Sequence, residues 1–153
     1  MYISLKNALF SQDKKVRFWD IRSGTQPMQE LELHGKITSL DLSRNGFWLL
    51  ACCRDDTLRL IDSRTYQLVR TFETEGLQLT CDWSRATFSP DSEYVTVGSQ
   101  SGRIYIWNIN DHSKIETVLN HHENPVIAVA WQPAGNSLTT CDKQKTVVVW
   151  AAI

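Results

Sequence analysis

The stretch that decides the fold is residues 13–20, DKKVRFWD, because its pattern returns three more times along the chain. Each copy has a polar turn, then alternating apolar residues, then a bulky residue. The other copies are residues 55–62 (DDTLRLID), 101–108 (SGRIYIWN) and 145–151 (KTVVVWA). The bulky anchors, separated by 42, 46 and 43 residues, are Trp19, Ile61, Trp107 and Trp150. A regular period of this length predicts an array of stacked structural repeats.

A second marker keeps the same period. Turn tetrads rich in Pro, Asn, Asp or Gly begin at Ser43 (SRNG), Ser89 (SPDS) and Gln132 (QPAG), and these starts lie 46 and 43 residues apart. Two features of different chemistry with one period are hard to obtain by chance. The tetrads therefore support the repeat independently of the anchors.

Within each period the hydrophobic pattern is that of strands. Residues 37–42 alternate between apolar and polar, and residues 126–131 do so more weakly. Runs of β-branched or aromatic residues lie at 48–53 and 94–98, between turn residues. Polar outer strands are expected near residues 29–33, 66–72 and 114–119. Because no stretch of the chain carries a helical apolar pattern, we predict an all-β protein.

A period of about 40–45 residues with four strands and a Trp-Asp ending resembles the blade of a WD-type β-propeller. Trp19-Asp20 is the complete dipeptide, Ile61-Asp62 and Trp107-Asn108 are near forms, and Trp150 lacks the acid. We predict a β-propeller of four-stranded antiparallel blades, incomplete, with about three to four blades. The expected repeat units are roughly 9–33, 34–72, 80–119 and 121–153, preceded by an atypical segment, 1–8.

The WD family joins its strands with a His–Ser/Thr–Asp–Trp hydrogen-bond network. In the tight turn six residues before the anchor, Asp13 and Asp55 fit this pattern, but Ser101 and Gln144 do not. His34 and the pair His121-His122 stand at the usual place of the histidine. We expect the network to be incomplete in every blade.

The number of repeats is too small for a closed ring of seven blades. Seven blades of this length would need about 300 residues, reckoned from the period. An open half-ring would expose two apolar blade faces, more than a stable monomer normally shows. We expect the sequence to be part of a longer protein; a truncated product and a self-associating chain stay open as alternatives.

Composition limits the classes of function. The chain of 153 residues has 16 Lys and Arg against 17 Asp and Glu, a net charge of −1, which argues against a dedicated nucleic-acid binder. Its longest apolar runs, 49–53 and 147–153, are far shorter than the ~20 residues that span a bilayer, so we expect at most peripheral membrane association. The four cysteines form no C-x-x-C pair and no secretion signal precedes them, which indicates reduced thiols in the cytosol.

The sequence offers little material for catalysis. His121, His122 and Glu123 lack the helical spacing and the third ligand of a metal site. Residues 99–102 (SQSG) are not a phosphate-binding loop, and no Ser/His/Asp set has the context of a nucleophile elbow. We predict no catalytic residue, no cofactor and no metal.

Three residues are candidates for an interaction surface. Arg17 and Arg59 occupy the same place, two residues before successive anchors, and Trp83 follows the long loop 73–82. One interpretation is docking to an acidic partner or an anionic membrane face. The favoured alternative is a solvated blade edge on which the arginine stems pack against neighbouring aromatic rings.

Longer stretches resemble one family more closely than WD proteins at large. They are residues 13–23 (DKKVRFWDIRS), 35–42 (GKITSLDL), 54–62 (RDDTLRLID), 82–91 (DWSRATFSPD), 98–107 (GSQSGRIYIW) and 128–133 (AVAWQP). Over about residues 9–153 the chain is similar to the C-terminal propeller of the metazoan autophagy-related protein 16 family. The substitution of Ile61 for tryptophan and the Asp82-Trp83 entry are the more discriminating marks.

The resemblance implies a non-enzymatic scaffold of autophagosome assembly, cytoplasmic and recruited to forming autophagosomal membranes. The family's N-terminal segment and coiled coil hold the conjugate that directs lipidation, and no such segment is recognisable here. The implied partners are autophagy adaptors, the conjugation complex through the full-length parent, and a membrane-associated proton pump. A WD scaffold of another pathway, such as a ubiquitin-ligase substrate receptor, is the alternative; an RNA- or chromatin-associated protein is disfavoured by the net charge.

Overall fold

The computed structural model describes residues 14–20, 26–79, 82–111 and 115–151. These residues contain thirteen strands and no helix. The strands are β1 (Lys15–Phe18), β2 (Gln29–Glu32), β3 (Ile37–Leu42), β4 (Trp48–Cys53), β5 (Thr57–Asp62), β6 (Gln67–Phe72), β7 (Ala86–Phe88), β8 (Tyr94–Gly98), β9 (Arg103–Asn108), β10 (Ile115–Asn120), β11 (Val126–Trp131), β12 (Ser137–Asp142) and β13 (Val147–Ala151).

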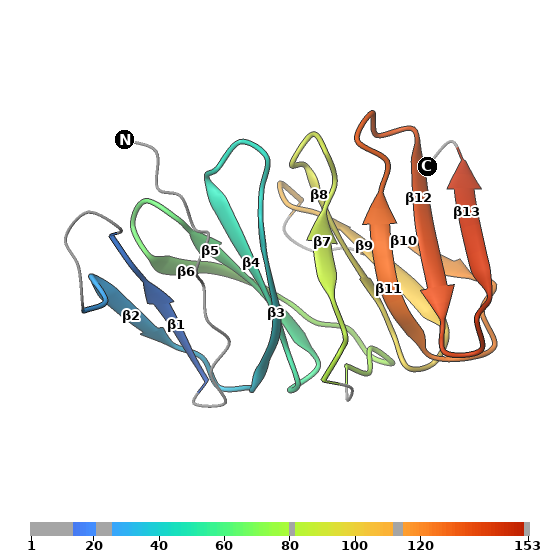
Figure 1. The fold of residues 1–153 in the computed structure, drawn as a ribbon, viewed down its shortest axis with the longest axis horizontal. Helices are drawn as coiled ribbons and strands as arrows, with labels where there is room; N and C mark the ends of the chain where they lie inside the picture. The colour runs from blue at the N-terminus through green and yellow to red at the C-terminus, as the bar shows by residue number, and fades with distance from the viewer. Residues whose placement is uncertain (1–13, 21–25, 80–81, 112–114, 152–153) are drawn as a thin grey trace.

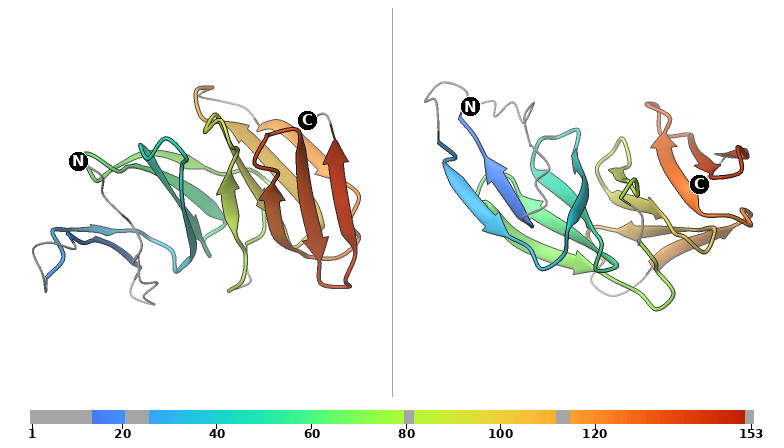
Figure 2. Two further views of the ribbon diagram at one scale, coloured as in Figure 1. Left: turned by 45° about the horizontal axis from the view of Figure 1, so that its top comes forward. Right: turned by 60° about the horizontal axis from the view of Figure 1, so that its bottom comes forward.

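Each strand pairs antiparallel with its neighbour in sequence, which gives four separate sheets. We call them blade 1 (β1–β2), blade 2 (β3–β6), blade 3 (β7–β10) and blade 4 (β11–β13). The sheets stand side by side in chain order, with β1 and β2 at one end and β13 at the other (Figure 1). From below, they follow an arc (Figure 2). The prediction of an all-β protein built from four-stranded antiparallel blades is confirmed.

The hydrophobic core lies between the blades. In blade 2, Leu50, Cys52, Leu58 and Leu60 face blade 3, while Leu49, Ala51, Cys53 and Ile61 face blade 1. Alternate residues of a strand point to opposite faces, so a sheet covered on both sides needs nearly continuous apolar strands. This requirement explains the run WLLACC of β4, which has no polar residue.

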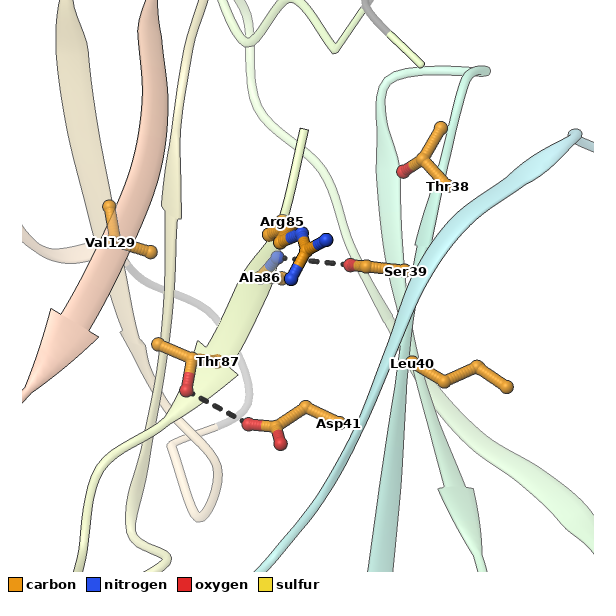
Figure 3. Close-up of a pocket in the computed structure, with 8 residues that line it drawn as sticks. All are labelled: Thr38, Ser39, Leu40, Asp41, Arg85, Ala86, Thr87 and Val129. Carbon is orange, nitrogen blue, oxygen red and sulfur yellow. Dashed lines mark hydrogen bonds between the residues drawn. The ribbon is translucent and has the colours of Figure 1, made fainter. Parts of the chain in front are cut away.

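Polar contacts join the inner strands of neighbouring blades. Ser39 on β3 accepts a hydrogen bond from the backbone N–H of Ala86 on β7, with the nitrogen 3.2 Å from Oγ. One oxygen of Asp41 accepts from the Thr87 hydroxyl and from the Phe88 N–H, both at 2.9 Å (Figure 3). Between blades 3 and 4, the Trp131 ring N–H donates to Thr96 at 3.1 Å. These bonds fix the stagger of the blades, which apolar packing alone leaves loosely specified.

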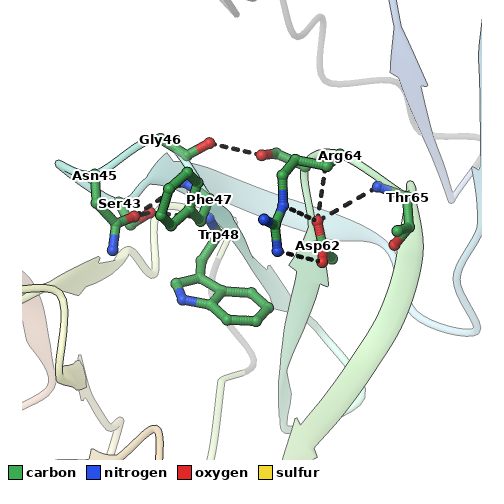
Figure 4. Close-up of polar contacts among 9 residues, drawn as sticks. Ser43, Asn45, Gly46, Phe47, Trp48, Asp62, Arg64 and Thr65 are labelled. Carbon is green, nitrogen blue, oxygen red and sulfur yellow. Dashed lines mark hydrogen bonds and ion pairs between the residues drawn. The ribbon is translucent and has the colours of Figure 1, made fainter.

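The turn tetrads owe their recurrence to a shared hydrogen-bond pattern. Ser43 donates to the Asn45 side chain at 2.7 Å and accepts from the Trp48 N–H at 2.9 Å (Figure 4). Ser89 repeats both contacts, with the side chain of Asp91 and the N–H of Tyr94. A short side chain that bonds to nearby backbone stabilises a turn, which is why Ser, Asn and Asp recur there.

The tight turn before each third strand also repeats in backbone conformation. Five residues before each anchor the chain takes a left-handed φ, of 63°, 60°, 83° and 71° at Lys14, Asp56, Gly102 and Lys145. At Gly102 there is a second constraint, since an added Cβ would lie 2.1 Å from the carbonyl oxygen of His122. Each repeat of the sequence therefore contains the same backbone turn at the same distance from its anchor.

Gly98 lets blades 3 and 4 approach closely. A Cβ at this position would lie 2.3 Å from Cγ1 of Val126 on β11. We predict that Gly98→Ala lowers the free energy of unfolding by about 1–3 kcal/mol, because overpacking forces the two blades apart. Urea unfolding measures this loss, and in the double variant with Val126→Ala the two losses should be less than additive. Strict additivity would show that Val126 is not the obstacle.

Candidate docking surface and its supporting network

The loop between β6 and β7 (residues 73–85) is anchored to the blades at several of its described residues. Leu77 and Leu79 are buried in the core between blades 2 and 3. The Leu79 N–H donates to the side chain of Asp56, and the backbone of Gln78 is hydrogen-bonded to the turn that joins β8 and β9. A loop held in this way loses little conformational entropy when it binds a partner.

Asp82 ties the end of this loop to blade 2. Its Oδ1 lies 3.1 Å from both Nζ of Lys36 and Nη1 of Arg54. The hydrogen bond from Lys36, aided by the charge of Arg54, holds the pKa of Asp82 below its usual value. Because all three side chains are substantially exposed, these ion pairs orient the loop more than they stabilise the fold.

Trp83 is the exposed aromatic side chain that this loop presents, with 52% of its surface accessible. Nζ of Lys143, from the turn between β12 and β13, lies 6.0 Å from the centre of its ring. We call Trp83 with Asp82, Lys36, Arg54 and Lys143 the Trp83 platform. An exposed indole with a lysine over its ring has the composition typical of an interface hot spot.

The two arginine candidates lie elsewhere. Arg59, on β5, is only 5% exposed; it pairs with the carboxylate of Asp55, and its Nη1 lies 3.5 Å from Sγ of Cys53. Arg17, on β1, pairs across the sheet with Glu30 of β2 at 2.9 Å. Arg59 is thus a structural residue inside blade 2, and its burial excludes the exposed surface that the sequence interpretation gave it. The shared position before the anchor follows from strand periodicity.

The anchor residues and the acids after them have separate structural uses. Ile61 and Trp107 are buried, each against the preceding blade, and Trp150 packs between blades 3 and 4, while Trp19 lies half-buried just after β1. Asp62 accepts the backbone N–H of Arg64 at 2.8 Å, and Asn108 accepts that of Asn110 at the same distance. The Trp-Asp type of ending therefore joins a packing residue to a turn-capping residue; Asp20, half-buried, follows Trp19 in the same order.

Blade 4 contains a buried chain of four polar side chains. The Trp150 ring N–H donates to the Thr140 hydroxyl at 2.9 Å, and this hydroxyl lies 2.7 Å from Nε2 of His122. Nδ1 of His122 lies 3.0 Å from a carboxylate oxygen of Asp142. With His122 neutral, the indole donates to the hydroxyl, the hydroxyl to Nε2, and Nδ1–H to the carboxylate, so every proton is used. The other oxygen of Asp142 accepts the N–H groups of Gln144 and Thr146, both at 2.9 Å.

The described residues hold no cluster of three or more His, Cys, Asp and Glu side chains suited to a metal ion. They also include no helix of the length and apolarity that crossing a membrane requires. Burial raises the pKa of the Cys52 thiol to about 11 and that of Cys53 to about 12, which makes both weak nucleophiles at neutral pH. Cys81 lies outside the described residues.

Comparison with known proteins identifies the repeat. The model of the WD domain, G-beta repeat, matches residues 25–62, 67–108 and 113–151. The chain belongs to the WD-repeat family. Each matched WD unit starts at or before the outer strand of one blade and ends on the third strand of the next, so the sequence repeat is offset from the sheet by one strand.

Comparison with individual proteins shows which WD-repeat proteins the chain resembles. The chain is 42% identical to "Autophagic-related protein 16.2" of Caenorhabditis elegans and 42% identical to "Protein Atg16l2" of Mus musculus, in each case over 90% of its length. It is 33% identical to "Autophagy-related protein 16" of Arabidopsis thaliana. It spans 26%, 22% and 27% of these proteins. The resemblance to the autophagy-related protein 16 family is confirmed, over about a quarter of the length of its members.

The WD network corrects one expectation from the sequence. The sequence predicts a network that is incomplete in every blade, and in blade 4 the reason is that Gln144 stands six residues before Trp150. The structure completes it in blade 4 with Asp142, two residues earlier, at the end of β12. Asp142 and Thr140 alternate on one strand and so share a face, which brings both to His122. In blade 2, by contrast, His34 is exposed and Asp55 pairs with Arg59 instead.

We predict that His122→Ala lowers the free energy of unfolding by about 2–4 kcal/mol, because Asp142 and Thr140 lose a buried partner. The nearby Glu123 is exposed and lies in the same turn between β10 and β11, so Glu123→Ala is the control and should change stability by no more than about 0.5 kcal/mol. Urea unfolding of both variants provides the measurement. Equal effects would show that the network contributes nothing specific.

Asp142 also makes the stability of the fold depend on pH in the acid range. Burial favours the protonated form of Asp142, but hydrogen bonds from Thr146, His122 and Gln144 prevail and hold its pKa below the usual 3.8. A lowered native pKa stabilises the fold above the unfolded pKa, and this contribution is lost as pH falls below about 4. Between pH 5 and pH 2, Asp142→Asn should therefore lose less unfolding free energy than the native chain. Parallel stability curves would contradict this.

Proposed function

We propose that this chain is a non-enzymatic interaction module of an autophagy scaffold and that the Trp83 platform docks its protein partners. The similarity to proteins named as autophagy-related supports the pathway. The observation that carries the docking assignment is the 52% exposure of Trp83 on a loop held by Asp82 and by two buried leucines. A large exposed side chain on a loop that is already anchored to the blades binds a partner with a smaller loss of conformational entropy.

The partners proposed are those that the family resemblance implies. They are autophagy adaptors, the conjugation complex through a full-length parent, and a membrane-associated proton pump. The proposed location is the cytoplasm, with recruitment to forming autophagosomal membranes. Arg17 keeps a secondary place as a contact residue, because 26% of its side chain stays exposed beside Glu30.

The test is binding of the purified chain to purified membrane-recruitment adaptors of the autophagy conjugate, with Trp83→Ala beside the native protein. Loss of a hot-spot indole should weaken binding tenfold or more, by about 2 kcal/mol. Phe47→Ala is the matched control, since Phe47 is also an aromatic with 47% exposure but lies on the turn between β3 and β4, at the opposite end of the blade.

Loss of binding in both variants would point to a general change in the fold rather than to docking at Trp83. Binding that survives Trp83→Ala would remove the platform from the interface. If no autophagy adaptor binds while components of a ubiquitin ligase do, the chain serves another pathway, which is the alternative reading of its WD repeats.

A further inference from the structure

A groove runs along the inner strands of blades 2, 3 and 4. It consists of two cavities of about 390 and 430 Å³ that share Asp41, Thr87 and Val129 as lining residues. Arg85 lines the first cavity, just before β7 begins, and the lining of the second includes Arg44 and Pro133, in the turns that follow β3 and β11. Five of the six residues of β3, Thr38 to Leu42, line the groove, a length of about 17 Å for an extended strand.

Most polar groups in this groove are used within the protein. The Ser39 hydroxyl accepts from Ala86, and the Thr87 hydroxyl donates to Asp41 (Figure 3). The Thr38 hydroxyl donates to the carbonyl of Cys52 at 3.2 Å. At the far end, Arg44 donates to the carbonyl of Pro133 at 3.2 Å and so links blade 2 to blade 4.

Arg85 is the exception. Its guanidinium lies between β3 and β7 beside Ser39 (Figure 3), and none of the hydrogen bonds or ion pairs found in the described part of the chain involves its side chain. The groove thus has a cation at each end, Arg85 and Arg44, and between them Asp41, one of whose oxygens already accepts two hydrogen bonds. Between the two cations, Val129, Ala130 and Trp131 contribute apolar surface.

We infer that this groove binds an extended segment of a partner protein, with an acidic side chain of that segment paired to Arg85. A planar guanidinium matches a carboxylate through two parallel hydrogen bonds. The length of the groove favours an extended peptide of about five residues over a small anion, which would fill only the Arg85 end. A nucleic acid needs a denser row of cations than two arginines with a carboxylate between them. This site is distinct from the Trp83 platform.

The probe is a fluorescein-labelled hexapeptide of alternating glutamate and leucine, titrated with the 153-residue chain and followed by fluorescence polarisation. Arg85→Ala should weaken binding about tenfold, and Arg85→Lys should weaken it less, because the charge stays while the paired geometry is lost. Arg64→Ala is the charge-matched control: Arg64 has 61% side-chain exposure and lies in the turn after β5, so binding should stay within twofold.

A second variant tests whether the peptide lies along the groove. Ala130 is exposed and lines the second cavity, so Ala130→Trp should obstruct that cavity without touching Arg85 and should also weaken binding. Replacing the glutamates of the peptide by glutamine should abolish the difference between the native chain and Arg85→Ala. Because Arg85 and Ala130 are both exposed, the variants should unfold in urea as the native chain does.

Four results would overturn the inference. Equal weakening by Arg64→Ala would show non-specific charge attraction, and unchanged binding in Arg85→Ala would remove the proposed contact. Weakening by Trp83→Ala alone would place the peptide on the Trp83 platform, which would leave the proposed function standing. Tighter binding of inositol hexakisphosphate than of the peptide, lost in Arg85→Ala, would make the groove a phosphate site.

Discussion

Face-to-face packing of one sheet against the next is the constraint on which this structure depends. Blade 2 buries apolar side chains on both faces, one set against blade 1 and one against blade 3. No blade can bury its two faces alone, so the fold exists only as a stack. The polar contacts from Ser39 and Asp41 to β7 set the stagger within that stack.

This arrangement divides the molecule into a rigid core and adjustable ends. The strands carry the packing, whereas the turns and the loop between β6 and β7 carry exposed side chains such as Trp83. The loop is nevertheless fixed, because Leu77 and Leu79 are buried in the same interface that joins blades 2 and 3. Docking residues can therefore vary at the blade ends while the packing that orients them stays constant.

The WD network shows how such a fold tolerates degenerate repeats. Blade 4 has the complete chain from Trp150 to Asp142, whereas blade 2 has the ion pair between Arg59 and Asp55. Both place a satisfied buried polar group near the turn before the third strand. What the fold needs at this place is paired hydrogen-bonding groups, since a buried unpaired charge is costly. The identity of the pair can change from blade to blade.

Strand periodicity and turn chemistry are local properties, and the sequence by itself determined them. The alternation at 37–42, the runs at 48–53 and 94–98 and the recurring turns predicted the strands and the stacked blades, because side-chain direction follows chain position. Only the tertiary structure decided which side chains are buried and which of them contact one another. Arg17 and Arg59 occupy equivalent positions in the repeat, yet one is partly exposed beside Glu30 and the other is buried against Asp55. The acid of the WD network in blade 4 is Asp142 rather than the residue in register, and the backbone N–H of Ala86 meets the Ser39 hydroxyl across two blades. Contacts between residues distant in the chain arise only when the sheets stack, and no local pattern records them.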